Sequence, residues 1–143
     1  MDTELGVIKN GIGGIEKKQL WNEIKKQLKP YGFKLRTKTT LIKDFPETIV
    51  MLQLQTSCYN AVNYYINIAC MVKCLNNNPS PLFDMDRMNF VRIKDKGSVK
   101  ECIDDILFYT DGFSDLKKLK DVTLSDICIY NSTSHELLKY LGI

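Results

Sequence analysis

The chain has 143 residues, of which 44% are hydrophobic and 26% are charged, and its formal net charge is +3. This length suits one domain with one core, and this composition is typical of a globular protein rather than a disordered or fibrous one. No stretch approaches the roughly 18 apolar residues that a membrane span needs, and the N-terminus lacks the pattern of a secretory signal. We therefore expect a cytoplasmic protein without membrane association.

The five cysteines are an odd number without paired spacing, which argues against a disulfide framework. Cys70 and Cys74 are four residues apart in an apolar run, so we expect both on one face of a strand as small hydrophobic side chains. There is no Cys-x-x-Cys motif and only one histidine, which argues against a zinc site. We expect neither a metal nor a cofactor.

Charge is distributed unevenly along the chain. Residues 1–43 contain ten Lys or Arg against four Asp or Glu, whereas residues 44–143 contain ten against thirteen. The first part is thus basic and the rest acidic, which favours weak attraction between the two parts or binding of an acidic partner by the first.

Residues 1–14 contain four glycines without a regular period, and we interpret them as a flexible lead-in to a single domain at residues 15–143. Apolar residues at helical spacing then predict a helix at residues 15–29. Pro30 and Gly32 should end it, because proline lacks an amide donor and glycine accepts positive φ. The expected buried side chains are Leu20, Trp21, Ile24 and Leu28.

The middle of the chain predicts strands. Alternation of apolar and charged side chains favours one strand at residues 33–43, ended by a turn at Asp44-Phe45-Pro46. Residues 47–74 are rich in β-branched and aromatic residues and predict two long interior strands, joined by a turn at residues 57–60. A further strand is expected at residues 88–93.

The C-terminal part predicts helices. Ser98 with Glu101 forms a capping box before an apolar helical stripe, and Thr133 with Glu136 forms a second before a helix that buries Leu137, Leu138 and Leu141. Ser114 is expected to cap a short helix that ends at residue 120. Residues 123–130 fit either a brief strand or a helical turn. The predicted fold class is α+β, an antiparallel sheet of four to five strands packed against an N-terminal helix and C-terminal helices.

Several short motifs in this order resemble a bacterial family known as domain of unknown function 4304. They are Pro30-Tyr31-Gly32-Phe33-Lys34, Leu54-Gln55-Thr56-Ser57, Tyr65-Ile66-Asn67-Ile68 and Arg92-Ile93. The resemblance covers roughly residues 15–110. It implies a small cytoplasmic α+β domain and lends no catalytic residues, because the family has no established activity.

Other candidate sites have simpler explanations. The glycines at 11–14 precede a predicted helix but lack the strand and the Lys-Ser/Thr of a phosphate loop. Asp84 and Asp86 could hold a cation, but a solvated loop or helix surface explains them with fewer assumptions. His135 is the only candidate for a general base at neutral pH, and it lies in a setting typical of a first helical turn.

The basic residues lack the interleaved aromatics of a nucleic-acid site; they are Lys18, Lys25, Lys29, Lys34, Arg36 and Lys38.

The most informative polar set is Gln53, Gln55, Tyr65 and Asn67, whose amides and phenol meet on one sheet face if the two long strands pair. The set is either a ligand or partner site or a buried network that fixes strand register.

We expect a non-enzymatic domain that binds another protein, with a toxin-immunity role as a narrower form by analogy. The alternative is a small hydrolase or transferase with a pocket near Tyr65 and Asn67. The sequence predicts no catalytic residue and leaves the oligomeric state open.

Overall fold

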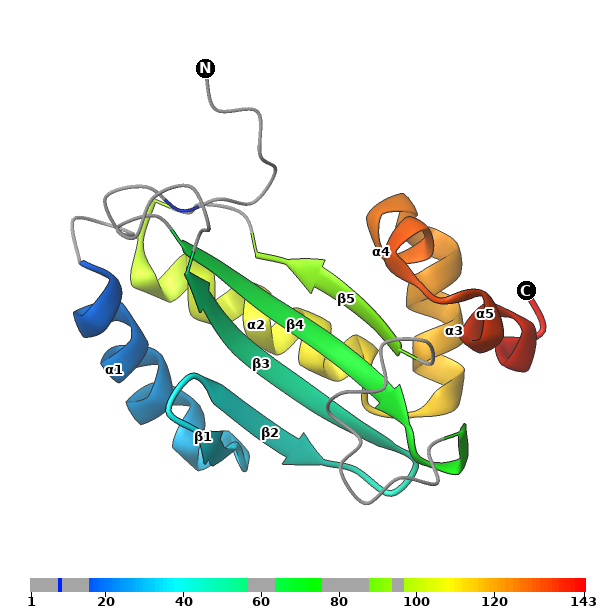
Figure 1. Cartoon of the computed structure of the whole chain (residues 1–143), viewed down its shortest axis with the longest axis horizontal. Helices are drawn as coiled ribbons and strands as arrows, with labels where there is room; N and C mark the ends of the chain where they lie inside the picture. The colour runs from blue at the N-terminus through cyan, green and yellow to red at the C-terminus, as the bar shows by residue number, and fades with distance from the viewer. Residues whose placement is uncertain (1–7, 9–15, 57–63, 76–87, 94–96) are drawn as a thin grey trace.

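The computed structural model describes residue 8 and residues 16–56, 64–75, 88–93 and 97–143. In these residues five strands form one antiparallel sheet in the order β1-β2-β3-β4-β5, so every strand pairs with its neighbour in sequence (Figure 1). The strands are β1 (Lys34–Thr37), β2 (Thr40–Asp44), β3 (Thr48–Thr56), β4 (Tyr64–Val72) and β5 (Met88–Arg92).

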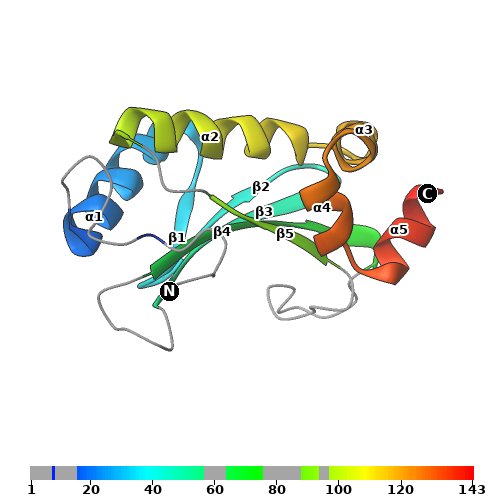
Figure 2. The same ribbon diagram turned by 90° about the horizontal axis from the view of Figure 1, so that it is seen from above.

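Helices flank this sheet mainly on one side. Figure 2 shows α1, α2 and α3 above the sheet, while α4 packs beside the edge strand β5. The α-helices are α1 (Lys17–Leu28), α2 (Val99–Gly112), α3 (Leu116–Ser125), α4 (Ile127–Ser132) and α5 (His135–Leu141), with two 3-10 turns, η1 (Lys29–Tyr31) and η2 (Lys73–Leu75). The predicted α+β class is confirmed.

The central hairpin is formed by β3 and β4, which pair along nine residues from Thr48 opposite Val72 to Thr56 opposite Tyr64. Both strands are interior, as predicted, and every residue of β4 is buried. Alternate residues such as Ile66 and Ile68 join the core under the helices, whereas Met71 belongs to a smaller apolar cluster on the other face. The predicted turn at 57–60 lies outside the described residues.

The first helix agrees with its prediction. α1 buries Leu20, Trp21, Ile24 and Leu28 against the sheet, because these residues recur at helical spacing on one side. The 3-10 turn that contains Pro30 ends at Gly32, whose φ of +90° places it in the left-handed region that glycine tolerates. Of the predicted lead-in the structure describes Ile8, which is buried and forms two backbone hydrogen bonds with Tyr64.

The single strand predicted at residues 33–43 is wrong. Thr37 pairs with Thr40, so the chain reverses at Lys38 and Thr39 and forms the short hairpin of β1 and β2. The indole Nε1 of Trp21 donates a 2.9 Å hydrogen bond to the carbonyl oxygen of Lys38, which ties this turn to α1. The apolar and polar alternation continues through the turn and therefore hides it, and Leu35, expected on a half-buried face, is 60% exposed.

The helix after β5 begins as the capping box predicts. Ser98 has extended backbone, and its Oγ accepts a 3.2 Å hydrogen bond from the amide of Glu101. The Glu101 carboxylate accepts from the amide of Gly97 at 3.3 Å rather than from that of Ser98. α2 then buries one apolar stripe against the sheet, which includes Ile103 and Ile106.

Two predicted caps are wrong by one residue. α3 is capped by Asp115, whose carboxylate accepts from the amide of Lys118 at 2.8 Å, because Ser114 lies in the preceding turn and donates its hydroxyl to the carbonyl of Asp111. α3 also extends to Ser125, beyond the predicted end at residue 120.

The cap of α5 is Ser134, because the hydroxyl of Thr133 donates instead to the carbonyl of Ile129. In α5 the predicted burial is confirmed for Leu137 and Leu141, whereas Leu138 is half-buried.

The ambiguous residues 123–130 are helical. α3 ends at Ser125, and Asp126 caps α4 by accepting from the amides of Cys128 and Ile129 at 2.9 and 3.3 Å. The buried Ile129 anchors this short helix, and α4 contacts β5. The alternative of a brief strand is thereby excluded.

The four cysteines that the structure describes divide into a buried and an exposed pair. Cys70 is buried in β4, as expected of a small hydrophobic side chain, and Cys102 is buried in α2. The placement of Cys74 on the same strand is wrong, because β4 ends at Val72 and Cys74 is exposed in η2. Its thiol donates a 2.8 Å hydrogen bond to the hydroxyl oxygen of Tyr140. In the described part of the chain, no helix is long and apolar enough to cross a membrane.

Candidate functional site

The four predicted site residues do meet on one face of the central hairpin. Gln53 lies opposite Asn67, and Gln55 lies opposite Tyr65, on the sheet face turned away from the main core. The amide Nδ2 of Asn67 donates a 2.9 Å hydrogen bond to Oε1 of Gln55. Tyr65 and Asn67 are buried at 4% and 7% exposure, whereas Gln53 is half-buried and Gln55 is exposed.

Arg92 joins this group and was missed at the level of sequence. It pairs with Asn67 across β4 and β5, so both side chains lie on the same face. Its guanidinium carbon lies 3.9 Å from the centre of the Tyr65 ring, which is a cation–π contact. The motif Arg92-Ile93 is visible in the sequence, but the register in which β5 pairs with β4 across their long connection is not. We define the polar cluster as Gln53, Gln55, Tyr65, Asn67 and Arg92.

Two buried polar atoms of the polar cluster have no partner in the part of the chain that the structure describes. Among the described residues, neither Oδ1 of Asn67 nor Nε of Arg92 has a hydrogen-bond partner. A buried polar atom without a partner costs about 1–3 kcal/mol. Native structures contain few such atoms, and water, an ion or a ligand commonly explains them.

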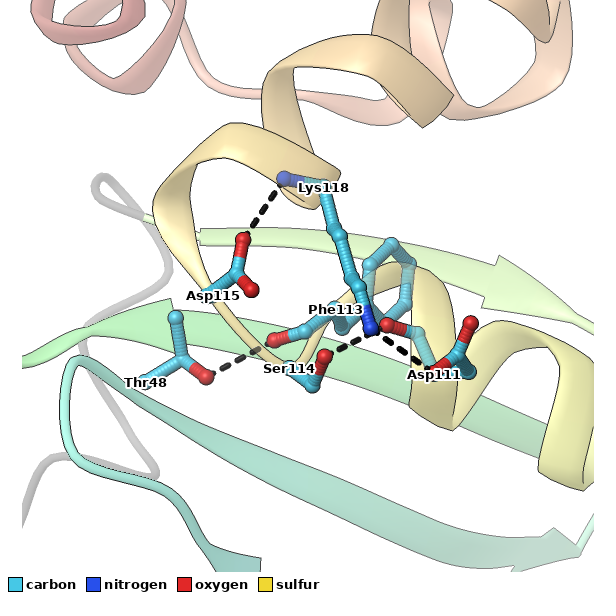
Figure 3. A network of polar contacts seen from close by, with 6 residues as sticks. All are labelled: Thr48, Asp111, Phe113, Ser114, Asp115 and Lys118. Atoms are coloured by element: carbon cyan, nitrogen blue, oxygen red, sulfur yellow. Dashed lines mark hydrogen bonds and ion pairs between the residues drawn. The ribbon is translucent and has the colours of Figure 1, made fainter.

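A groove of about 560 Å³ lies elsewhere, where the turn between β2 and β3 meets the junction of α2 and α3. Figure 3 shows this junction, in which the hydroxyl of Thr48 donates to the carbonyl of Phe113. The groove is lined by Tyr31, Lys43, Phe45, Pro46, Glu47, Leu107, Thr110, Asp111, Ser114, Asp115 and Lys118. No sequence motif indicates this groove, because its walls come from two segments that are at least sixty residues apart.

The charged groups of the groove already have partners within the protein. Lys118 forms a 3.1 Å ion pair with Asp111 (Figure 3). Glu47 accepts from the amide of Leu116 at 3.3 Å, and the ammonium of Lys43 lies 5.0 Å from the centre of the Phe45 ring. The contact between Glu47 and Leu116 links the α2–α3 junction to the start of β3, and the ion pair links α2 to α3. The charged groups of the groove therefore stabilise the fold.

A third region is the outer surface of the C-terminal helices. We define the helical surface as Phe108, Leu124, Ile127 and Tyr130, whose exposed fractions are 63, 59, 68 and 40%. In the described part of the chain, these are four of the seven large apolar side chains that are exposed. Isolated exposed apolar residues are normal, but a concentration on neighbouring elements marks an interaction surface.

Carboxylates lie near Phe108 and Ile127 of the helical surface. Asp104 and Asp111 are exposed one turn before and after Phe108 on α2. Burial raises the pKa of the Tyr109 phenol, and the nearby carboxylates of Asp126 and Asp105 raise it further. Residues 97–143 contain eight Asp or Glu against five Lys, so this part of the surface is acidic.

The remaining candidates gain no support. Among the described residues, no three His, Cys, Asp or Glu side chains are placed to hold a metal ion. His135 is exposed as the first residue of α5, and Asp84, Asp86 and the glycines at 11–14 lie outside the described residues. The basic residues are solvent-facing: Lys18, Lys29, Lys34, Arg36 and Lys38 are exposed and Lys25 is half-buried.

Comparison with known proteins gives one match. The family model described as Domain of unknown function (DUF4304) matches residues 24–107, which is more than half of the chain. No curated protein and no solved structure matches the chain. The matched segment runs from the middle of α1 into α2 and contains the whole sheet, whereas the helical surface begins at the residue that follows it.

Proposed function

The chain belongs to the family described as Domain of unknown function (DUF4304), and from this premise we propose that it is a non-enzymatic domain that binds another protein. The observation that carries the proposal is the exposure of Phe108 on α2 and Ile127 on α4, at 63 and 68%; both helices pack against α3. Water contact with such large apolar side chains is unfavourable, by about 25 cal/mol for each Å². A partner that covers them gains this free energy.

The charge of the surface specifies the kind of partner. Asp104 and Asp111 flank Phe108 and form 3.1 Å ion pairs with Lys100 and Lys118, and Asp126 lies at the start of α4 beside Ile127. Residues 97–143 contain eight Asp or Glu against five Lys, so an acidic balance remains after this pairing. Aromatic anchors inside a charged rim are typical of protein interfaces, in which opposite charge gives specificity. We therefore propose a partner with an apolar pocket inside a basic rim. A toxin-immunity role is the narrower form of this proposal, with a basic toxin as the partner.

The enzyme alternative depends on a pocket near Tyr65 and Asn67. The groove described above is lined by neither residue, since it lies at the α2–α3 junction. Its charged groups already have partners in the fold: Lys118 pairs with Asp111, Glu47 accepts from the amide of Leu116, and Lys43 lies over the ring of Phe45. The exposed helical surface therefore favours a binding domain over a hydrolase or transferase.

The test compares two matched variants of the full chain. Phe108→Ser with Ile127→Ser removes the two most exposed apolar side chains of the helical surface. Leu35→Ser removes a side chain of similar exposure, 60%, on β1 and serves as the control. The proteins captured by each form from cell extract are quantified by mass spectrometry, and the partner is then purified for titration calorimetry.

We expect one partner to be captured by the wild type and by the control, and to be lost with the double variant. With the purified partner, the double variant should raise Kd at least about tenfold, and added salt should weaken wild-type binding. Equal affinity of the purified partner for wild type and double variant would contradict the proposal. Circular dichroism checks that all forms are folded.

A further inference from the structure

The groove at the α2–α3 junction carries one carboxylate more than it has ammonium groups. Its charged side chains are Glu47, Asp111, Asp115, Lys43 and Lys118, so three negative charges face two positive ones. Lys118 pairs with Asp111, whereas Glu47 and Asp115 each accept a hydrogen bond from a backbone amide at the start of α3. Because a backbone amide has no net charge, the groove as a whole favours an added cation.

Aromatic rings line the same groove. Tyr31 is 49% exposed, and the ammonium of Lys43 lies 5.0 Å from the centre of the Phe45 ring, which is within the distance of a cation–π contact. One ring face of the groove is thus already used by a cation of the protein itself. Carboxylates beside aromatic rings suit arginine in particular, because its flat guanidinium stacks on a ring and pairs with a carboxylate.

The size and position of the groove suit a side chain of a protein partner. Its volume of about 560 Å³ is that of a ligand site, and its surface is mainly apolar. Asp111 lines the groove and follows Phe108 by three positions on α2, and residues three apart are neighbours on the surface of a helix. A partner that covers Phe108 therefore comes within reach of the groove.

We infer that the groove receives an arginine side chain of the protein that covers the helical surface. The arginine belongs to the basic rim proposed for that partner, so this inference rests on the proposed function. Its guanidinium pairs with the carboxylate of Glu47, which is exposed and whose bond to the amide of Leu116 is long, at 3.3 Å. The guanidinium plane stacks on an aromatic ring, and the alkyl stem lies on the apolar wall.

The experiment uses a small mimic of the arginine side chain. Acetyl-arginine amide is titrated into the ¹⁵N-labelled full chain at constant ionic strength. Acetyl-citrulline amide is the matched probe, because it keeps the shape and lacks the charge. The readouts are the backbone amide signals of Leu116 and Lys118, which bond to the carboxylates of Glu47 and Asp115. We expect saturable shifts with the arginine probe and at least about threefold weaker binding of the citrulline probe.

Two substitutions should change the affinity for the arginine probe in opposite directions. Glu47→Gln removes the charge but keeps an oxygen acceptor, and it should weaken binding about threefold. Lys43→Met removes the competing ammonium from the Phe45 ring and should strengthen binding. The controls repeat the two charge changes elsewhere and should bind as the wild type does. They are Glu16→Gln, before α1, and Lys34→Met, on exposed β1.

Three results would overturn the inference. Equal affinity for the arginine and citrulline probes, or no effect of Glu47→Gln, would show that the charge is not recognised. Tighter binding of free L-arginine than of the blocked probe would assign the groove to a small molecule. Equal affinity of the purified partner for the wild type and Glu47→Gln would show that its arginine does not enter the groove.

The same variants keep failure of this inference distinct from failure of the proposed function. Phe108→Ser with Ile127→Ser leaves every side chain that lines the groove in place, so this double variant should bind the arginine probe normally. Loss of partner binding in the double variant but not in Glu47→Gln would overturn the role of the groove and leave the proposed function standing.

Discussion

The hydroxyl of Thr48 donates a 2.7 Å hydrogen bond to the carbonyl oxygen of Phe113, and both residues are fully buried. The bond joins the first residue of β3 to the end of α2, across sixty-five positions of sequence (Figure 3). The carbonyl of Phe113 follows the last turn of α2, where helical partners run out, and the thiol of Cys70 approaches it at 3.6 Å. One polar contact thus fixes where α2 ends over the sheet.

Thr48→Val tests this contact, because valine keeps the shape and removes the hydroxyl. We expect the free energy of unfolding to fall by about 1–3 kcal/mol, since the carbonyl of Phe113 stays buried with a weaker partner. The measurement is urea unfolding followed by the fluorescence of Trp21, the only tryptophan. Thr39→Val, at an exposed position, is the control and should change stability by less than about 0.5 kcal/mol. Equal stability of the two variants would show that the bond is not needed.

Trp21→Phe tests the tie between α1 and the turn of the first hairpin. It keeps most of the buried ring but removes the Nε1–H that donates to Lys38. We expect a loss of about 1 kcal/mol and faster amide hydrogen exchange in β1 and β2 than in β3 and β4. Circular dichroism replaces fluorescence as the probe in this variant. A uniform increase in exchange across the sheet would contradict a local role for the bond.

The thiols should differ sharply in reactivity. Burial raises the pKa of the Cys70 thiol, so at pH 8 it carries less of the reactive thiolate than an exposed cysteine does. We expect iodoacetamide to modify Cys74 and Cys128 in the native protein, and Cys70 and Cys102 only after denaturation. Peptide mass spectrometry measures the modified fraction at each position. Rapid native modification of Cys70 would mean that β4 opens readily.

Stability should fall at alkaline pH partly through Tyr109. Burial and the carboxylates of Asp126 and Asp105 raise the pKa of its phenol above the ordinary value of about 10. Below that pH the phenol keeps its proton in both states; above it the unfolded chain loses the proton first, so the free energy of unfolding decreases as pH rises.

Tyr109→Phe removes this contribution and keeps the ring that stacks on Phe113. The free energy of unfolding from urea titrations should therefore decrease less between about pH 9 and pH 11 in the variant than in the wild type. Cys70 and Tyr140, whose pKa values are also raised, are unchanged in both proteins and cancel in the comparison. Parallel pH profiles would show that Tyr109 does not contribute.

The sequence predicted the polar cluster incompletely, for a physical reason. Alternation in β3 and β4 puts Gln53, Gln55, Tyr65 and Asn67 on one face, and antiparallel pairing brings them together. Arg92 lies in β5, which follows β4 after a long connection, and the sequence does not indicate the register in which the two strands pair. Its position opposite Asn67 is therefore known only from the sheet. The helical surface was likewise beyond prediction, because an amphipathic pattern shows which side of a helix is apolar but not which apolar residues remain uncovered.

By itself the sequence determined the elements whose signals are local. Each of these signals depends on residues close together in the sequence. They are the apolar spacing of α1, the stop at Gly32, the cap at Ser98 and the alternation of β4. The tertiary structure decided what depends on distant atoms. The indole of Trp21 bonds to the carbonyl of Lys38, where the chain folds one predicted strand into a hairpin, and the register of β5 places a guanidinium on the Tyr65 ring. Contacts across tens of residues leave no periodic trace in the sequence, because either partner alone fits many environments.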